Sequence, residues 1–274
     1  MVGRRKILKR SRNVFVLQPR DSEILKKVFD YRFLCGKQIK NLCGFNCLKR
    51  TNDRLRKLFD NGFLSRRLFI DAFKKRILYL PGPGAAEIVS SKTGLDPSEI
   101  GKKRFKALKT RDSFLSHFLS INDFRYSLEM VSRQNSRMKT EIWKYKPALF
   151  SEEEARIYPD AYFRLGYSDK TYNFFLEIDR SVESRKRIKK KMEDYLDYGL
   201  TGDFERQFGF QNKHFRLLIV CKTLVRLKTL LRIIEKVTDK SFCWLAVEKD
   251  VSPEKILSSI WFRSNKEGRF SLIE

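Results

Sequence analysis

The segment LKRTNDRLRKLFDNGFLSRRLFIDAFKKRILYL, residues 48–80, decides the fold of the N-terminal part of the chain. Its first half has apolar residues with the spacing of one helical face, at Leu48, Leu55, Leu58 and Phe59. Lys and Arg fill the opposite face of that helix. Asn61-Gly62 ends the helix, and residues 63–70 and 75–80 then predict two strands around a basic loop at 71–74. The segment therefore predicts a basic helix followed by a β-hairpin.

Two further helices are predicted before this segment, at residues 19–34 and 37–43, and Gly44-Phe45-Asn46 marks a turn. Helix, turn, basic helix and hairpin is the order of a winged helix-turn-helix, whose third helix enters the major groove while the hairpin follows the phosphates. The DNA-binding candidates are Lys49, Arg50, Thr51, Asn52, Arg54, Lys74 and Lys75. Four of them, at positions 50, 51, 52 and 54, are candidates to read bases. The alternative is that the module docks proteins or dimerises.

The composition favours a polyanionic partner. The chain has 274 residues, with 59 Lys and Arg against 33 Asp and Glu, which leaves a net charge of +26. Such a field attracts nucleic acid, and we expect double-stranded DNA. The first 18 residues contain basic residues but no acid, as in a phosphate-contacting arm. No transmembrane-length run or signal-peptide core is present, and five irregularly spaced cysteines do not form a disulfide framework. We expect a cytoplasmic, nucleoid-associated protein without a membrane partner.

The second half has a different pattern. A winged-helix domain at 19–93 is expected to be followed by a linker at 94–111, which is rich in Lys, Gly and Pro, and by a second domain at 112–274. In that domain, helices are predicted at 112–138, 183–198, 225–237 and after Pro253, and strands at 141–145, 158–167, 172–179, 215–221 and 242–247. This order predicts an α+β chain whose second domain has a mixed sheet flanked by helices.

Three acidic residues of the second domain are candidates for chemistry. Glu177 and Asp179 point to the same side of one strand, because side chains alternate, and Asp160 follows Pro159 at the neighbouring strand. Three carboxylates could hold Mg²⁺ or Mn²⁺, which would activate water for phosphodiester hydrolysis. Lys191 and Tyr195 share a face of the next helix, where the ammonium could stabilise developing charge. Alternatively, Pro-Asp is a common turn pair, and Glu-Ile-Asp-Arg is a charged strand end.

The motifs PDAYFRL, FFLEIDRS and KMEDYLDY resemble the PD-(D/E)XK (restriction-endonuclease-like) nucleases, and Lys-x-x-x-Tyr is similar to the Gln-x-x-x-Tyr helix of recombination-helicase nuclease domains. The whole chain resembles the replication-relaxation family of plasmids and other mobile elements, through RLRKLFDNGF, YLPGPGAAEI and SHFLSINDFRYSL as well as these motifs. The resemblance covers about residues 20–200. It implies a role in plasmid replication control or mobilisation.

Two positions depart from these patterns. Asp179 stands where the nuclease pattern has Lys, so Lys191 would have to supply the cation. Trp143 is followed by Lys144 and Lys146, where family members often have an acid. Glu129 and Glu141 are possible substitute acids. His117 lies in a matching segment, but a lone histidine beside apolar residues is more often packed than catalytic.

Three functions stay open at this point. The first is a DNA-binding replication or mobilisation protein whose nuclease-like site is degenerate. The second is an active Mg²⁺-dependent DNA endonuclease. The third is a winged-helix transcriptional repressor whose second domain dimerises, since a homodimer is compatible with the sequence.

Overall fold

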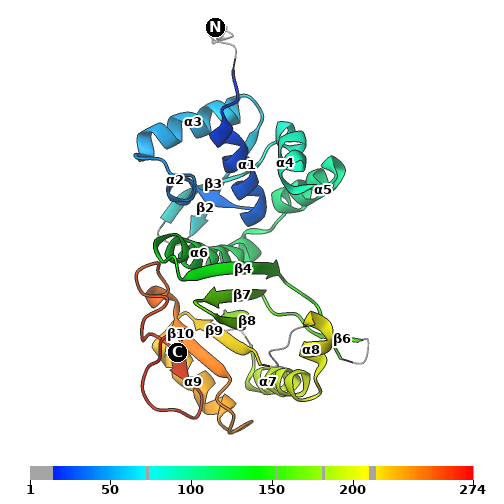
Figure 1. Ribbon diagram of the computed structural model, residues 1–274, viewed down its shortest axis with the longest axis vertical. Coiled ribbons are helices and arrows are strands. Elements are labelled where there is room, and N and C mark those ends of the chain that lie inside the picture. The colour runs from blue at the N-terminus through cyan, green and yellow to red at the C-terminus, as the bar shows by residue number, and fades with distance from the viewer. Residues whose placement is uncertain (1–14, 72–73, 152–153, 181–182, 210–213, 274) are drawn as a thin grey trace, which may run out of the picture. The chain divides into compact units, whose positions relative to one another are not determined.

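The structure is a computed structural model that describes residues 15–71, 74–151, 154–180, 183–209 and 214–273. The chain divides into two compact units, Met1–Thr110 and Arg111–Glu274 (Figure 1). Most of the predicted basic arm, residues 1–14, lies outside the described residues. Both units combine helices with strands, as the sequence predicts.

The first unit contains the predicted helices and hairpin. Its elements are α1 (Pro19–Tyr31), β1 (Leu34–Cys35), α2 (Gly36–Leu42), α3 (Leu48–Asp60), β2 (Leu64–Asp71) and β3 (Lys74–Pro81). The strands form an antiparallel sheet in the order β1-β3-β2. Gly62 has φ +77°, a backbone conformation that favours glycine, and so allows the turn between α3 and β2. Apolar residues of all three helices, such as Leu25, Ile39 and Leu55, are fully buried.

The segment 94–111 is not an extended linker. Its largest part is the helix α5 (Pro97–Leu108), which packs against α4 (Ala86–Thr93) and β3. Asp96 begins α5 because its side chain accepts a hydrogen bond of 2.7 Å from the Ser98 amide. Ile100 and Ala107 are buried on one face of the helix. Most of the basic residues of the segment, and Gly101, therefore lie on a helix of the first unit.

The second unit is built around one mixed sheet in the order β11-β10-β9-β8-β7-β4. The elements are α6 (Asp112–Gln134), β4 (Met138–Tyr145), β5 (Leu149–Ser151), β6 (Glu154–Ile157), β7 (Ala161–Tyr167), β8 (Lys170–Asp179), α7 (Arg185–Leu200), α8 (Asp203–Phe208), β9 (Arg216–Cys221), α9 (Leu224–Ile234), β10 (Cys243–Val247) and β11 (Phe262–Arg263). β9 is parallel to both β8 and β10, and the other neighbouring strands are antiparallel.

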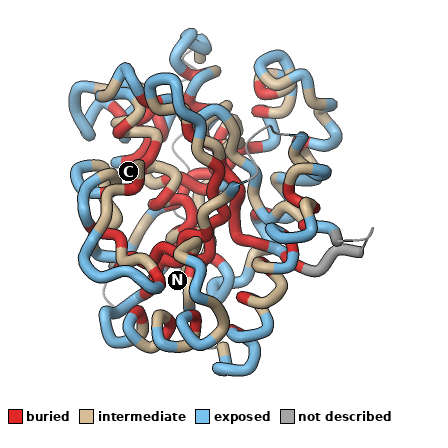
Figure 2. Tube along the Cα trace, turned by 60° about the horizontal axis from the view of Figure 1, so that its bottom comes forward, coloured by how far each residue is buried: buried red, intermediate tan, exposed pale blue. Residues whose placement is uncertain are grey.

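Helices cover both faces of this sheet. One core packs α6 and the C-terminal segment around Trp261 against one face, while the other core packs α7, α8 and α9 against the opposite face. All five residues of β10 are buried, and such buried stretches (red) run through the interior in Figure 2. A strand that is covered on both faces is apolar throughout, which explains the sequence of β10. The predicted mixed sheet flanked by helices is confirmed.

Several short elements differ from the sequence prediction. No helix follows Pro253 in the described residues, where the chain forms turns instead. The small β5–β6 pair, α8 and β11 were not predicted. None of the five cysteines forms a disulfide, as expected. Among the described residues, no helix combines the length and the apolar character that crossing a membrane requires.

Candidate functional site

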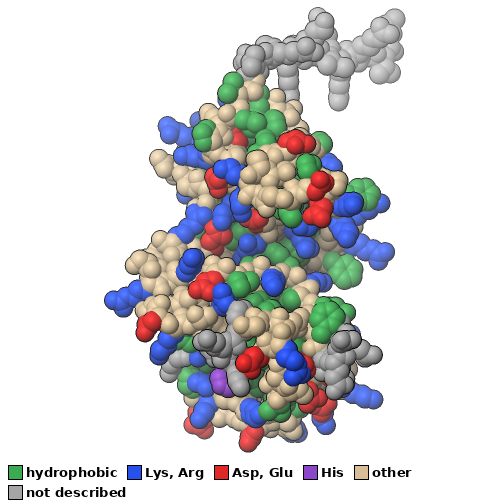
Figure 3. Space-filling view, turned by 45° about the vertical axis from the view of Figure 1, so that its right-hand side comes forward, with side chains coloured by type: hydrophobic (Ala, Val, Ile, Leu, Met, Phe, Trp, Pro, Cys, Tyr) green, Lys and Arg blue, Asp and Glu red, His purple; other side chains and the backbone are tan. Residues whose placement is uncertain are grey.

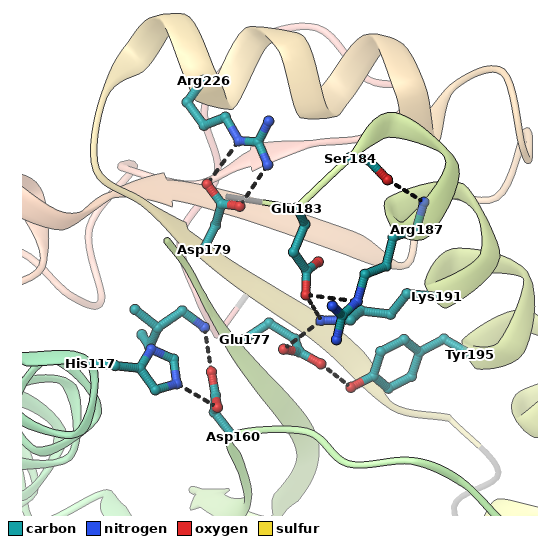
Figure 4. Close-up of polar contacts among 11 residues, drawn as sticks. His117, Asp160, Glu177, Asp179, Glu183, Ser184, Arg187, Lys191, Tyr195 and Arg226 are labelled. Carbon is teal, nitrogen blue, oxygen red and sulfur yellow. Dashed lines mark hydrogen bonds and ion pairs between the residues drawn. The ribbon is translucent and has the colours of Figure 1, made fainter. Parts of the chain in front are cut away.

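The three predicted acids Asp160, Glu177 and Asp179 line one pocket at the end of β8. The cavity has a volume of about 240 Å³ and is bounded by α6, the start of β7, the end of β8, α7 and α9. Its polar lining consists of His117, Tyr158, Asp160, Glu177, Asp179, Arg180, Glu183, Arg187 and Lys191. Ser184 begins α7 by accepting a hydrogen bond from the Arg187 amide, which directs the first turns of this helix toward the cavity (Figure 4).

Glu177 is buried, and both of its carboxylate oxygens have partners. Tyr195 donates a hydrogen bond of 2.7 Å to Oε1 of Glu177, and Nζ of Lys191 donates one of 3.2 Å to Oε2. Lys191 also contacts Glu183 at 3.3 Å. The predicted helix face of Lys191 and Tyr195 is therefore the one that meets the acidic strand, because a spacing of four residues places both side chains over the same point.

Burial dominates the proton equilibria of this group. It raises the pKa of Glu177 to about 7, against the opposing charge of Lys191 and with a further contribution from Asp160. Burial alone would lower the pKa of Lys191, but the charges of Glu177 and Glu183 outweigh it, so that pKa is raised. The pKa of Tyr195 is raised by burial and by Glu177. Tyr195 is therefore a proton donor to Glu177 and stays neutral.

Asp160 connects two strands and a helix. Its Oδ2 accepts a hydrogen bond of 2.9 Å from the Ile178 amide of β8, and its Oδ1 lies 2.7 Å from Nε2 of His117 in α6. His117 was predicted to be packed rather than catalytic, but it lies in the pocket beside Asp160. No sequence signal joins these two residues, since 43 positions separate them.

Asp179 is held by a residue that the sequence analysis did not single out. Arg226 of α9 donates two hydrogen bonds of 2.9 Å, from Nε to Oδ2 and from Nη2 to Oδ1. This is the paired geometry in which a guanidinium binds a carboxylate most strongly. Thr223 caps α9 and thereby fixes its first turn, from which Arg226 reaches β8.

The predicted three-carboxylate metal site does not form with these side-chain positions. Asp160, Glu177 and Asp179 line the same cavity, but each carboxylate oxygen has a protein partner, as described above. Among the described residues, no three His, Cys, Asp or Glu side chains are grouped as metal ligands. A Mg²⁺ ion needs several free oxygen ligands, so the arrangement does not fit one.

The two substitute acids lie elsewhere. Glu129 pairs with Arg133 at 2.9 Å on α6, and Glu141 of β4 pairs with Arg164 at 2.6 Å. Neither is among the described residues that line the cavity. Both ion pairs are partly exposed; the first lies within α6, and the second joins β4 to β7.

The sequence matches the replication-relaxation family over residues 25–213, which is more than half of the chain. The chain belongs to the replication-relaxation family. The resemblance inferred from the sequence motifs is therefore confirmed. The match includes α3 and every predicted site residue from Asp160 to Tyr195, but it ends before Arg226. The cation that holds Asp179 is thus outside the part of the chain that defines the family.

The structure is similar to that of the restriction endonuclease FokI, with 13% identity and a TM-score of 0.36. The similarity covers 93% of this chain and 49% of the FokI chain, so this chain spans about half the length of that protein. No curated protein matches the sequence.

The family match also includes the predicted DNA-binding residues, and the structure separates them into two groups. Lys49, Arg50 and Asn52 on α3 and Lys75 on β3 are exposed. The side chain of Lys74, where β3 begins, lies outside the described residues. Thr51 is buried and Arg54 is held in an ion pair with little exposure, which corrects two of the predicted base-reading positions.

The reason for that correction is local packing. Thr51 is fully buried, and its hydroxyl donates a hydrogen bond of 2.9 Å to the Cys47 carbonyl one turn earlier. Arg54 pairs with the buried carboxylate of Asp21 in α1 and donates a hydrogen bond of 3.0 Å to the Val16 carbonyl. Two exposed cations of α3, Arg56 and Lys57, were not among the candidates, although their helical spacing could have indicated them.

Proposed function

We propose that this replication-relaxation protein binds duplex DNA through a winged helix and acts in replication control or mobilisation of a plasmid or other mobile element. The observation that carries the proposal is the exposed face of α3. It presents Lys49, Arg50, Asn52, Arg56 and Lys57 to solvent, while Leu55 and Leu58 hold the opposite face in the core. A helix that is fixed on one side and cationic on the other is suited to a DNA groove.

The order of elements supports the same interpretation. α1, α2 and α3 are followed by the β2–β3 hairpin, and the short β1 pairs with β3. This is the connectivity of a winged helix-turn-helix, with α3 as the recognition helix and β2–β3 as the wing. In such a module the first residues of the recognition helix approach base edges, and Lys49, Arg50 and Asn52 occupy those positions.

Electrostatics support a nucleic-acid partner for the whole chain. The net charge is +26, and Lys and Arg side chains (blue) are distributed over the visible face in Figure 3. A protein with this charge releases counterions when it binds DNA, so its affinity should fall steeply as salt increases.

The test is DNA binding measured by fluorescence anisotropy over a series of salt concentrations. Arg50→Ala and Lys49→Ala should each weaken binding and reduce the salt dependence, whereas Lys228→Ala on the exposed side of α9 should change neither. Equal losses from all three substitutions would remove the recognition role of α3. Absence of binding by the unaltered protein to any duplex would refute the function itself.

A metal-dependent endonuclease is a second candidate, favoured by the pocket that brings Asp160, Glu177 and Lys191 together. Binding of a divalent ion there would require Lys191 to release Glu177 or Arg226 to release Asp179. A plasmid-nicking assay with Mg²⁺ and with Mn²⁺ tests this candidate, with Glu177→Ala as the matched control. Nicking that persists in the control would come from a contaminant, and no nicking by the unaltered protein would exclude the candidate.

A further inference from the structure

The β2–β3 hairpin carries an apolar patch that faces solvent. Leu68, Ile70 and Ile77, here called the hairpin patch, are 58%, 60% and 49% exposed. Leu68 and Ile77 are directly opposite each other in the strand register. Ile70 is two residues beyond Leu68 and therefore on the same face of β2. The three side chains form one continuous surface rather than scattered exposed positions.

Cations border the hairpin patch along the strands. Lys75 is the register partner of Ile70 and is exposed. At the other end, Arg66 occupies the same face and is the register partner of Tyr79. The Arg66 guanidinium lies 4.3 Å from the ring centroid of Phe59 in α3 and 5.5 Å from that of Tyr79. Arg66 therefore lies between the hairpin patch and Phe59, near the C-terminal end of α3. The patch has a positive group at each end, Arg66 and Lys75.

These charges decide which partner fits the patch. A second copy of the hairpin would bring Arg66 and Lys75 of both chains together, and like charges oppose such pairing. Duplex DNA offers phosphates for both cations, and the faces of its stacked base pairs are apolar. Aliphatic side chains on minor-groove proteins enter between base steps in this way, and they unstack the bases and bend the duplex. The β-branched Ile70 and Ile77 are stiff enough to keep the shape of such a wedge.

We propose that the hairpin patch inserts between base pairs in the minor groove and opens a base step, while Arg66 and Lys75 bind the phosphates on either side. The inference rests on the proposed DNA-binding function and adds a mode of action to it. In this mode α3 positions the protein, and the hairpin deforms the duplex beside it. Local unstacking of a duplex is a useful first step for a protein that acts where DNA strands separate.

The experiment uses the full chain and a panel of short duplexes, each with 2-aminopurine in one pyrimidine–purine step, where unstacking is easiest. Binding should increase the fluorescence of the probe in at least one duplex. The double variant Leu68→Ser/Ile77→Ser should lose that increase and bind about tenfold more weakly, because two aliphatic side chains no longer leave water. Its salt dependence should be unchanged, since no phosphate contact is removed.

The matched control is Val225→Ser, an exposed apolar residue on α9 of the other unit. It should retain both the affinity and the fluorescence increase. Because the substituted positions are exposed, all variants should melt at the same temperature as the unaltered protein. A double variant that keeps the fluorescence increase would overturn the inference.

The outcomes separate this inference from the function on which it rests. If the unaltered protein binds DNA but no probe responds, the hairpin inference fails and the DNA-binding proposal stands. If the unaltered protein does not bind DNA, the function fails first. Sedimentation of the same samples adds a third outcome: a dimer that the double variant dissociates would make the hairpin patch a protein interface and would also overturn the inference.

Discussion

Arg226 joins α9 to β8 by binding both carboxylate oxygens of Asp179 at 2.9 Å. The two side chains are 16% and 7% exposed, so the pair is largely removed from water. Asp179 occupies the position at which the nuclease pattern has a lysine. Arg226 supplies a cation to this position from a different element, but it is paired with Asp179 and is not among the described residues that line the cavity.

Removing Arg226 should therefore destabilise the second unit. Arg226→Ala leaves a nearly buried carboxylate without its cation, which costs about 3–5 kcal/mol of unfolding free energy. Urea unfolding followed by circular dichroism measures the loss. Lys228→Ala on the same helix is the control, and it should change stability by less than about 0.5 kcal/mol. Adding Asp179→Asn to Arg226→Ala should recover part of the lost stability. If Arg226→Ala and Lys228→Ala were equally stable, the prediction would be wrong.

The buried Glu177 should make stability depend on pH near neutrality. Its pKa is about 7 in the folded protein against 4.5 in the unfolded chain, so the folded state binds this proton more tightly. The resulting stabilisation is fully present below pH 4.5 and is lost as the pH rises through about 7. The loss should be on the order of 1–3 kcal/mol.

Unfolding measured between pH 4 and pH 8, a range that brackets both pKa values, tests this prediction. The stability difference between the unaltered protein and Glu177→Gln should change across that range, because glutamine does not titrate. Glu183→Gln is the matched control, since Glu183 contacts the same Lys191 but at 3.3 Å from outside the buried pair. If the Glu177→Gln curve has the same slope as the curve of the unaltered protein, the slope has another origin.

Asp160 should protect one backbone amide of β8. Its Oδ2 accepts a hydrogen bond of 2.9 Å from the Ile178 amide and so joins the start of β7 to β8. Asp160→Ala leaves that buried donor unpaired, which costs about 1–3 kcal/mol. Hydrogen exchange of the Ile178 amide, followed by NMR, should be accelerated in Asp160→Ala. His117→Ala should leave it slow, because His117 contacts the other oxygen, and equal acceleration in both variants would contradict this division of roles.

The sequence predicted which face of a helix or strand a residue occupies far better than it predicted the residue's partner on another element. The periodicity of α7 placed Lys191 and Tyr195 on one face, and the alternation of β8 placed Glu177 on the side that this face covers. Neither pattern could indicate that Arg226 binds Asp179, or that Arg54 binds Asp21, because these partners are 47 and 33 positions apart. Asp179 was therefore predicted to bind a metal and Arg54 to bind DNA, although in the fold each is paired with another side chain.

The missed helix α5 has a different cause. Lys, Gly and Pro in the segment favoured a linker, but Asp96-Pro97 is a helix-start signal, and Ile100 and Ala107 recur at helical spacing. The structure uses both features. In this segment the apolar periodicity predicts the observed helix, whereas the Lys, Gly and Pro content does not. The turns after Pro253 reflect the opposite error, since the start signal there is not followed by a helix.

Two arginines of α3 should separate DNA binding from stability. Arg54 pairs with Asp21, which is 1% exposed, so Arg54→Ala leaves a buried carboxylate unpaired and should cost about 3–5 kcal/mol of unfolding free energy. Arg50 lies one turn before Arg54 and is exposed, and Arg50→Ala should leave stability within about 0.5 kcal/mol. The effects of the two substitutions on DNA binding should have the opposite order. Arg50→Ala should reduce the salt dependence by about one phosphate contact, whereas Arg54→Ala, corrected for its folded fraction, should not.

Thermal melts and salt titrations of both variants provide the measurements. A stable Arg54→Ala protein with reduced salt dependence would show that Arg54 leaves Asp21 to contact DNA, and the DNA-binding face of α3 would then include Arg54.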